Sequence, residues 1–281
     1  GLLAFAAASQ NTTGAETSQV TTQPVPRSGE KWWVQRHERI NRRLSEGNVD
    51  AVFIGDSITE AWEHYHGLAV WDAFYGHRQI VNLGFGGDQT QHVLWRLDHS
   101  HFAGLQPKAA FVMIGANNIS AGHSTQQIAD GILAIVERLH EKLPTARIVM
   151  HGVLCRGQKP DDAGRQKAVA VNQALAKLAA QRGFEMCDLA ESFLNRDGTA
   201  KAELMKPDFL HLSAKGYQAW AEAIEGTLAG MLGDQPVRIP PPCPKEKDAA
   251  EAIAALGGIA LMARDGRVTT VDLGRNPKAG G

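Results

Sequence analysis

The sequence predicts an α/β fold, a three-layer α/β/α sandwich around a central, mainly parallel five-stranded sheet. Three observations predict it. From residue 32 onward, short apolar runs alternate with longer amphipathic segments, which is the order of repeated strand–helix–strand units. The apolar runs are continuous, as expected of strands that are buried on both faces. Each run ends near Gly or Asp, residues that favour a turn into the next element.

The expected strands and helices form one domain over residues 31–232. The strands are short β-rich segments at residues 51–55, 79–84, 109–115, 146–153 and 184–189. The remaining segments have apolar residues three and four positions apart, which predicts amphipathic helices. These helices are expected at residues 31–46, 59–73, 89–98, 124–142, 164–181 and 213–232.

The two ends of the chain differ in composition from this domain. Residues 1–30 pass from an apolar, Ala-rich stretch to a Thr-rich one, a pattern typical of the remnant of a secretory signal and a disordered spacer. We therefore expect export to the periplasm or the extracellular space; a floppy arm, a cloning artefact and a cytoplasmic protein are the alternatives. Residues 233–281 predict a proline-rich linker, a short helix and two β-prone runs around an Asp-Gly hairpin signal. This C-terminal appendage is too short for a core of its own.

Charge and hydropathy argue against several classes of partner. The 29 basic and 30 acidic residues nearly cancel, so no strong net field attracts nucleic acid or an anionic membrane surface. Beyond the N-terminus there is no apolar run of about 18 residues, so no membrane span is expected. A small, roughly neutral molecule is the expected partner.

Metal sites and disulfides are not expected either. The three cysteines, Cys155, Cys187 and Cys243, form no CxxC pair, and the first two read as core residues. The His-x-His pairs at residues 64–66 and 99–101 lack a third ligand at a defined spacing, so we interpret them as solvated loop histidines. The sequence thus implies no metal and no organic cofactor.

Ser57, which follows the first expected strand in the run Gly-Asp-Ser, has two interpretations. Ser is a preferred N-cap where a strand turns into a helix. A hydrolase nucleophile also fits, but it requires a base, a group that orients the base, and donors for an oxyanion. Asp208 and His211 lie three residues apart before the last expected helix, so one turn brings carboxylate and imidazole together. For this pair the alternative is a solvated turn.

Donors for an oxyanion follow the second and third expected strands. Gly86 and Gly87 leave backbone N–H groups exposed where a helix begins, and Asn117 carries a side-chain amide. The alternatives are a tight turn for the glycines and an Asx-turn for Asn117. In a parallel sheet the carboxyl ends of the strands share one edge, so these groups are expected to converge on Ser57. Such convergence favours Ser57 as a nucleophile.

Two further residues have interpretations of lower weight. Trp62 follows the serine closely and is a candidate pocket wall, although aromatic residues at helical spacing more often fill a core. Arg96 is interpreted as a structural ion-pair partner. Neither residue is assigned to the reaction.

Four blocks, GDSIT, NLGFGGDQTQHVLWRL, IGANN and PDFLHLSAKGY, resemble in order and spacing the four sequence blocks of the SGNH, or GDSL-type, serine esterase superfamily. Within it, FGGDQTQHVLWRL, LCRGQKP and DFLHLSAKGY are similar to the catalytic subunits of the intracellular platelet-activating factor acetylhydrolases. The resemblance covers residues 31–232 and implies the flavodoxin-like SGNH hydrolase fold. Ala116 departs from the Thr of many members, and the GxSxG signature of other lipases is absent.

The resemblance also implies roles for particular residues. Ser57, Asp208 and His211 become the catalytic triad. The N–H groups of Ser57 and Gly87 and the side chain of Asn117 become the oxyanion hole.

The expected activity is hydrolysis of short-chain, acetyl-type carboxylic esters by a serine esterase, through an acyl-enzyme intermediate. Its substrate is a small acyl ester of an alcohol, lipid or saccharide, and a homodimer is expected by analogy. Export favours an alternative, a carbohydrate deacetylase of the acetylxylan type. A non-catalytic glycan-binding module is a further alternative, but such a module has no need for all five residues of the site.

Overall fold

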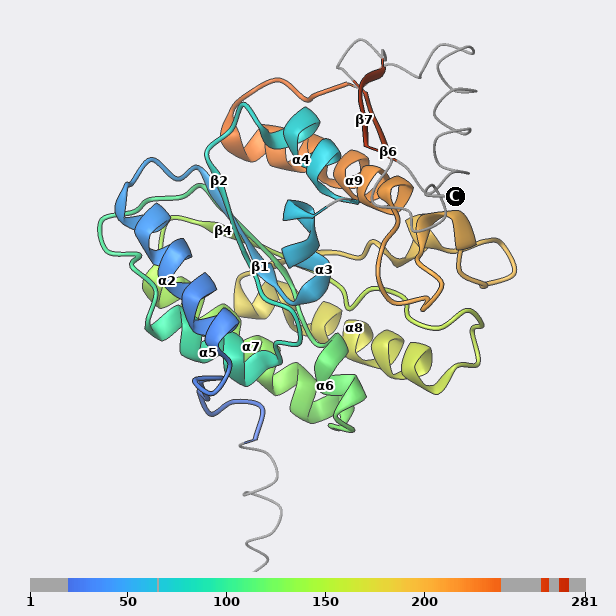
Figure 1. The fold of residues 1–281 in the computed structure, drawn as a ribbon. Helices are drawn as coiled ribbons and strands as arrows, with labels where there is room; N and C mark the ends of the chain where they lie inside the picture. Colours follow the sequence, from blue (N-terminus) through green and yellow to red (C-terminus); the bar gives the residue numbers. More distant parts are fainter. Residues whose placement is uncertain (1–19, 65, 239–258, 263–267, 273–281) are drawn as a thin grey trace, which may run out of the picture.

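The central layer is a sheet of five parallel strands in the order β2-β1-β3-β4-β5 (Figure 1). The computed structural model describes residues 20–64, 66–238, 259–262 and 268–272. The strands are β1 (Ala51–Gly55), β2 (Ile80–Gly84), β3 (Ala109–Met113), β4 (Arg147–His151) and β5 (Glu185–Cys187). All five lie within the expected segments, and the predicted fold class is confirmed.

Each face of the sheet packs against its own layer of helices. In β1, Val52 and Ile54 belong to one core, while Ala51 and Phe53 belong to the other. Because both sets of alternate side chains are buried, the strand is apolar throughout. The first core contains side chains of α2 (Lys31–Ser45), α5 (Thr90–Asp98), α7 (Thr125–Lys142) and α8 (Ala163–Arg182). The second contains side chains of α4 (Leu68–Tyr75) and α9 (Ala214–Leu232).

The expected helix at residues 59–73 is wrong as a single element. The structure has instead α3 (Ser57–Glu60), the 3-10 turn η1 (Ala61–Glu63) and α4. The chain passes so close to η1 at Gly67 that a Cβ there would lie 2.4 Å from the carbonyl oxygen of Ala61. Three short elements were not expected, α6 (Ala116–Ser120), η2 (Ala190–Phe193) and η3 (Ala202–Leu204).

Residues 20–30, which we call the N-terminal strap, contact the domain rather than forming a spacer. Thr21 is fully buried, and its hydroxyl donates to the carbonyl of Gln127 at 2.6 Å. The Thr90 hydroxyl donates to the carbonyl of Thr21 at 2.9 Å, and the Val25 N–H donates to the carbonyl of Gln91 at 3.0 Å. The spacer expectation is therefore wrong for the strap. Residues 1–19, which carry the expected signal remnant, lie outside the described residues.

The chain after α9 includes an antiparallel hairpin of β6 (Ile259–Met262) and β7 (Val268–Asp272), on either side of the predicted Asp-Gly turn. The expected short helix and Cys243 lie outside the described residues. Within the described part of the chain, no helix has the length and apolar character needed to cross a membrane.

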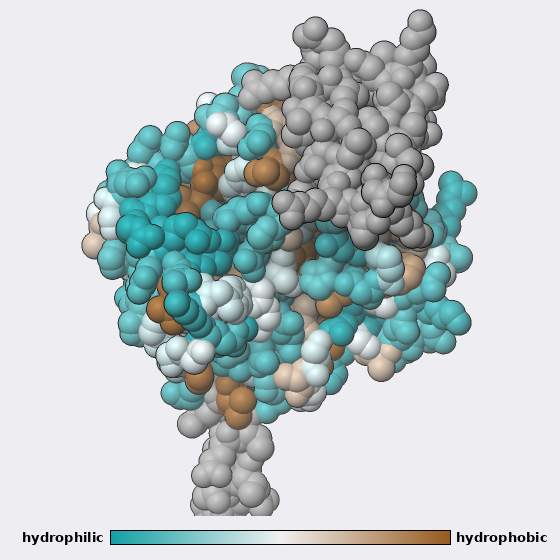
Figure 2. Space-filling model, in the orientation of Figure 1, coloured by the Kyte–Doolittle hydropathy of each residue, from teal (hydrophilic) through white to brown (hydrophobic). Residues whose placement is uncertain are grey.

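The face of the molecule in Figure 2 is mostly hydrophilic, with small separate apolar patches. Few large apolar side chains are exposed among the described residues, and one of them, Trp32, is 42% exposed at the start of α2.

Candidate active site

Ser57 is the first residue of α3, directly beyond the carboxyl end of β1. The N-cap of this helix is Asp56, whose carboxylate accepts the N–H of Ile58 at 3.0 Å. Burial raises the pKa of Asp56 to about 7. Because Asp56 caps the helix, the alternative in which Ser57 serves only as a helix cap is wrong.

Ser57, His211 and Asp208 form a continuous chain of hydrogen bonds. Ser57 Oγ and His211 Nε2 are 2.9 Å apart, and His211 Nδ1 and Asp208 Oδ2 are 2.7 Å apart. Burial opposes ionisation of Asp208, but the hydrogen bond from His211 and two backbone N–H groups bring its pKa down to about 2. An ionised carboxylate only accepts, so Nδ1 carries a proton and Nε2 is left to accept the Ser57 hydroxyl.

The loop that carries Asp208 and His211 is fixed by its own backbone. Asp208 Oδ1 accepts the N–H groups of Leu210 and His211, both at 3.0 Å, as in an Asx-turn. The Lys206 N–H donates to the His211 carbonyl at 2.8 Å, which closes the loop. Phe209, between the two site residues, has a φ of 47°. Asp208 therefore holds both the ring and the backbone of His211.

Gly86 and Gly87 lie beside Ser57 because the strand ends are in register. Gly55 of β1 pairs with Gly84 of β2. A Cβ placed on Gly86 would lie 3.8 Å from the Cβ of Ser57. The Asp88 N–H donates to the Phe85 carbonyl at 3.1 Å, so residues 85–88 form a tight turn. Gly87 has a φ of 76° in that turn, and its N–H has no hydrogen-bond partner among the described residues.

Asn117 lies in the first turn of α6, just beyond the end of β3. Its side-chain amide donates to the carbonyl of Asp88 at 2.9 Å. An amide has two N–H donors, so one remains for a ligand. This contact links Asn117 to the glycine turn, and the three strand ends thus bring their polar groups to one edge of the sheet, as expected.

Asp88, which the sequence analysis did not single out, organises the same edge. Its side chain is fully buried and accepts Arg96 Nε at 2.7 Å, Trp33 Nε1 at 2.8 Å and Arg27 Nη1 at 2.8 Å. A buried carboxylate needs such compensation. Arg96 is thereby confirmed as a structural ion-pair partner.

Trp62 does not line the site, so that prediction is wrong. Its side chain is fully buried, with ring centroids 4.6 Å from Tyr217 and 5.0 Å from Trp220. The exposed aromatic residue is Trp32 instead. Its indole carbon Cη2 lies 4.0 Å from the position that a Cβ on Gly86 would take, so the indole lies next to the glycine turn.

Histidines of the two His-x-His pairs, at residues 64–66 and 99–101, contact other side chains of the domain. His99 stacks on Trp95 with centroids 3.9 Å apart, and His101 Nδ1 is 2.9 Å from the Ser45 hydroxyl. His64 is 3.7 Å from Glu60. In the described ranges no group of three or more His, Cys, Asp or Glu side chains is placed to hold a metal ion.

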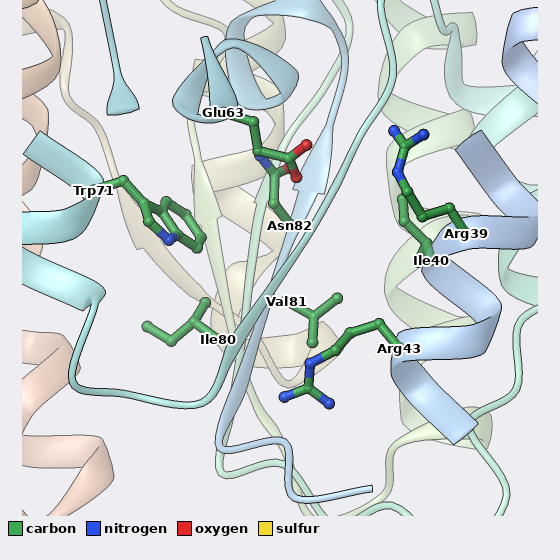
Figure 3. A pocket seen from close by; sticks show the side chains of 8 residues that line it. All are labelled: Arg39, Ile40, Arg43, Glu63, Trp71, Ile80, Val81 and Asn82. Atoms are coloured by element: carbon green, nitrogen blue, oxygen red, sulfur yellow. The ribbon is translucent and has the colours of Figure 1, made fainter. Parts of the chain in front are cut away.

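A separate cavity of about 220 Å³ lies along the open edge of the sheet, on β2 (Figure 3). Its lining residues come from α2, η1, α4 and β2; they are Arg39, Ile40, Arg43, Glu63, Trp71, Ile80, Val81 and Asn82. None of the predicted site residues lines it. The β2 residues of the lining, Ile80 to Asn82, begin the strand, whereas Gly86 and Gly87 follow its carboxyl end. The cavity is therefore distinct from the candidate active site.

Comparison with known proteins gives the family. The model of the GDSL-like Lipase/Acylhydrolase family matches residues 53–219. The chain is 35% identical over 221 residues to platelet-activating factor acetylhydrolase IB subunit alpha1 of Bos taurus, across 77% of this chain and 92% of the bovine protein. These matches confirm the predicted resemblance.

Solved structures agree on the fold. A GDSL-like lipase from Bacteroides thetaiotaomicron superimposes with a TM-score of 0.58 at 16% identity, covering 70% of this chain and 97% of that one. A catalytic mutant of an acetylxylan esterase from Geobacillus stearothermophilus has a TM-score of 0.54 at 17% identity, covering 68% and 97%. Fold, site geometry and sequence matches agree: the chain belongs to the GDSL-like lipase/acylhydrolase family and is an ester hydrolase.

Proposed function

We propose that the chain hydrolyses short-chain carboxylic esters, acetyl esters above all, with Ser57 as nucleophile, His211 as general base and Asp208 as the group that orients it. The observation that carries the proposal is the continuous chain of hydrogen bonds from Ser57 Oγ to Asp208 Oδ2. Nucleophile, base and orienting carboxylate in this order are the parts that acyl transfer requires.

In the first half of the reaction, the Ser57 proton passes to His211 Nε2 while Oγ attacks the ester carbonyl carbon. The carbonyl π electrons move to the oxygen and give a tetrahedral oxyanion. Its collapse breaks the bond to the leaving alkoxide, which takes the proton from Nε2, and leaves an acyl-Ser57 enzyme. Water then attacks this ester with His211 again as base, which releases the carboxylic acid and restores Ser57.

The oxyanion is stabilised by three donors in this proposal, the N–H groups of Ser57 and Gly87 and the side-chain amide of Asn117. Support comes from the N–H of Gly87, which has no hydrogen-bond partner in the part of the chain that the structure describes, and from the second amide N–H of Asn117. Both donors are held before substrate arrives, which is the condition for efficient stabilisation of the transition state.

The acetyl preference is supported by the relatives that match most of the chain, whose names specify acetylhydrolases. A saccharide leaving group is a second candidate, favoured by the exposed indole of Trp32 next to the glycine turn. An indole exposed at a site offers a large apolar face on which a sugar ring stacks.

The test is hydrolysis of p-nitrophenyl acetate, butyrate and octanoate by the wild type and by Ser57→Ala, with acetylated xylan in parallel. We expect the highest kcat/KM for acetate and loss of all activity in Ser57→Ala. Release of acetate from xylan, reduced in Trp32→Ala, would identify the saccharide substrate. Equal rates for Ser57→Ala and the wild type would contradict the proposed function.

Export and dimerisation stay predictions. Fractionation of cells that express the full-length gene tests export; recovery of the enzyme only in the cytosolic fraction would refute it. The molar mass from light scattering tests the dimer, and a monomer mass would refute it.

A further inference from the structure

Arg27, in the N-terminal strap, touches the turn that carries the proposed oxyanion donor Gly87. Its Nη1 donates to the carbonyl of Gly86 at 2.6 Å and to Asp88 Oδ1 at 2.8 Å. The other side of the guanidinium is held by Glu30, with Nε and Nη2 donating to its two carboxylate oxygens at 2.8 and 2.7 Å. The Arg27 side chain is only 16% exposed. The guanidinium of Arg27 is therefore held on both sides, by Gly86 and Asp88 on one and by Glu30 on the other.

The carbonyl that Arg27 binds and the Gly87 N–H belong to the same peptide group. A trans peptide is planar, so its C=O and N–H point in opposite directions. A donor that fixes the Gly86 carbonyl therefore also fixes the direction of the Gly87 N–H.

This peptide is the central one of the turn at residues 85–88. The 4→1 hydrogen bond from Asp88 to Phe85 and the positive φ of Gly87, with no positive φ at Gly86, identify a type II turn. A rotation of the central peptide converts type II into type I, and it reverses both the carbonyl and the N–H. With glycine at both central positions, neither form meets a Cβ. The two glycines by themselves therefore do not determine which way the Gly86–Gly87 peptide points.

The preceding peptide is held from the other direction. The Gly86 N–H donates to Glu60 Oε2 at 2.5 Å. Glu60 ends α3, the helix that Ser57 begins. The Gly86 N–H is thus tied to the nucleophile's own helix, and Arg27 supplies the contact that fixes the next peptide.

We propose that Arg27 is a positioning residue, which locks the Gly86–Gly87 peptide in the orientation that presents the Gly87 N–H to the oxyanion. The proposal rests on the proposed function. It gives the N-terminal strap a role in the rate of the reaction, because the Arg27 side chain of the strap contacts the turn beside Ser57.

The test compares Arg27→Met and Arg27→Lys with the wild type in the full chain, using p-nitrophenyl acetate. The matched control is Thr21→Val, which weakens the strap at Gln127 without touching the turn. Loss of one oxyanion donor lowers kcat by about 100-fold or more, so a donor that is misoriented in about nine molecules out of ten or more should lower it by about 10-fold to 100-fold. We expect that loss in Arg27→Met, an unchanged KM, partial recovery in Arg27→Lys and a nearly wild-type Thr21→Val.

A second readout separates orientation of the donor from a general structural effect. A trifluoromethyl ketone forms a tetrahedral oxyanion adduct with a serine nucleophile, so its Ki should rise in Arg27→Met by the same factor by which kcat falls. Three results would overturn the proposal: a wild-type kcat in Arg27→Met, an equal loss in Thr21→Val, or a change confined to KM. A wild type with the same rate as Ser57→Ala would refute the proposed function itself, a different outcome from these.

Discussion

Asp208→Asn should nearly abolish activity while leaving the fold intact. Asp208 Oδ1 accepts two backbone N–H groups, and Oδ2 accepts His211 Nδ1. In the variant, the single amide oxygen is drawn to the two backbone donors, so the NH₂ group faces Nδ1. Nδ1 must then accept, the ring proton moves to Nε2, and His211 no longer accepts the Ser57 proton.

The size of the loss follows from these contacts. Turning the amide over would restore the active tautomer but would sacrifice two hydrogen bonds worth about 1 kcal/mol each. At about 1.4 kcal/mol per factor of ten, only about one molecule in thirty adopts that orientation. Loss of the carboxylate charge beside the imidazolium lowers the rate further, so kcat should fall by about 10³ to 10⁴ in total.

The assay is kcat for p-nitrophenyl acetate, with urea unfolding as the check on folding. Asp197→Asn is the matched control, since Asp197 is an exposed carboxylate that also accepts a backbone N–H two residues on. We expect it to keep wild-type activity. A kcat within tenfold of the wild type in folded Asp208→Asn would refute the proposed role of Asp208.

Four further outcomes are expected. Asn117→Ala should lower kcat by about 100-fold, and a wild-type initial rate would remove Asn117 from the oxyanion hole. Gly87→Ala forces a side chain into a positive φ that costs about 1 to 2 kcal/mol; urea unfolding should show that loss, and unchanged stability would contradict it. Since the pKa of Asp208 is about 2, against an ordinary value of about 3.9, its carboxylate should still be ionised at about pH 4; an NMR titration of the side-chain carboxyl checks this, and a midpoint near the ordinary value would be inconsistent. Burial lowers the pKa of His151 to about 4, so protonation of the unfolded chain costs stability as pH falls from about 6.5 towards 4; His151→Phe should remove that part of the loss, and an identical pH dependence of the unfolding free energy in both proteins would argue against it.

The parts of the fold that follow from local pattern were predictable. The strands lie in short, mostly apolar runs, and all five were found near their expected bounds. The prediction of one helix at residues 59–73 was wrong because the apolar spacing continues across Gly67, where the chain bends. The bend brings Gly67 close to the backbone of Ala61. Spacing does not report such a tertiary contact.

The site residues also divide into those that the sequence pattern predicts and those that depend on long-range contacts. Ser57, Gly87 and Asn117 follow the ends of neighbouring parallel strands, so topology alone brings them to one edge. Arg27 could not be found in this way, because its contact with Gly86 joins residues 59 positions apart. Trp62 was misjudged for a similar reason, since its burial depends on its packing against α9.

The most direct test of the central claim is covalent labelling of the folded protein by a fluorophosphonate, located by mass spectrometry of the digested chain. The account predicts a single adduct on Ser57, much slower labelling in His211→Gln and no labelling in Ser57→Ala. Labelling of a different residue, or an unlabelled wild type that is fully folded, would contradict the assignment of Ser57 as the nucleophile.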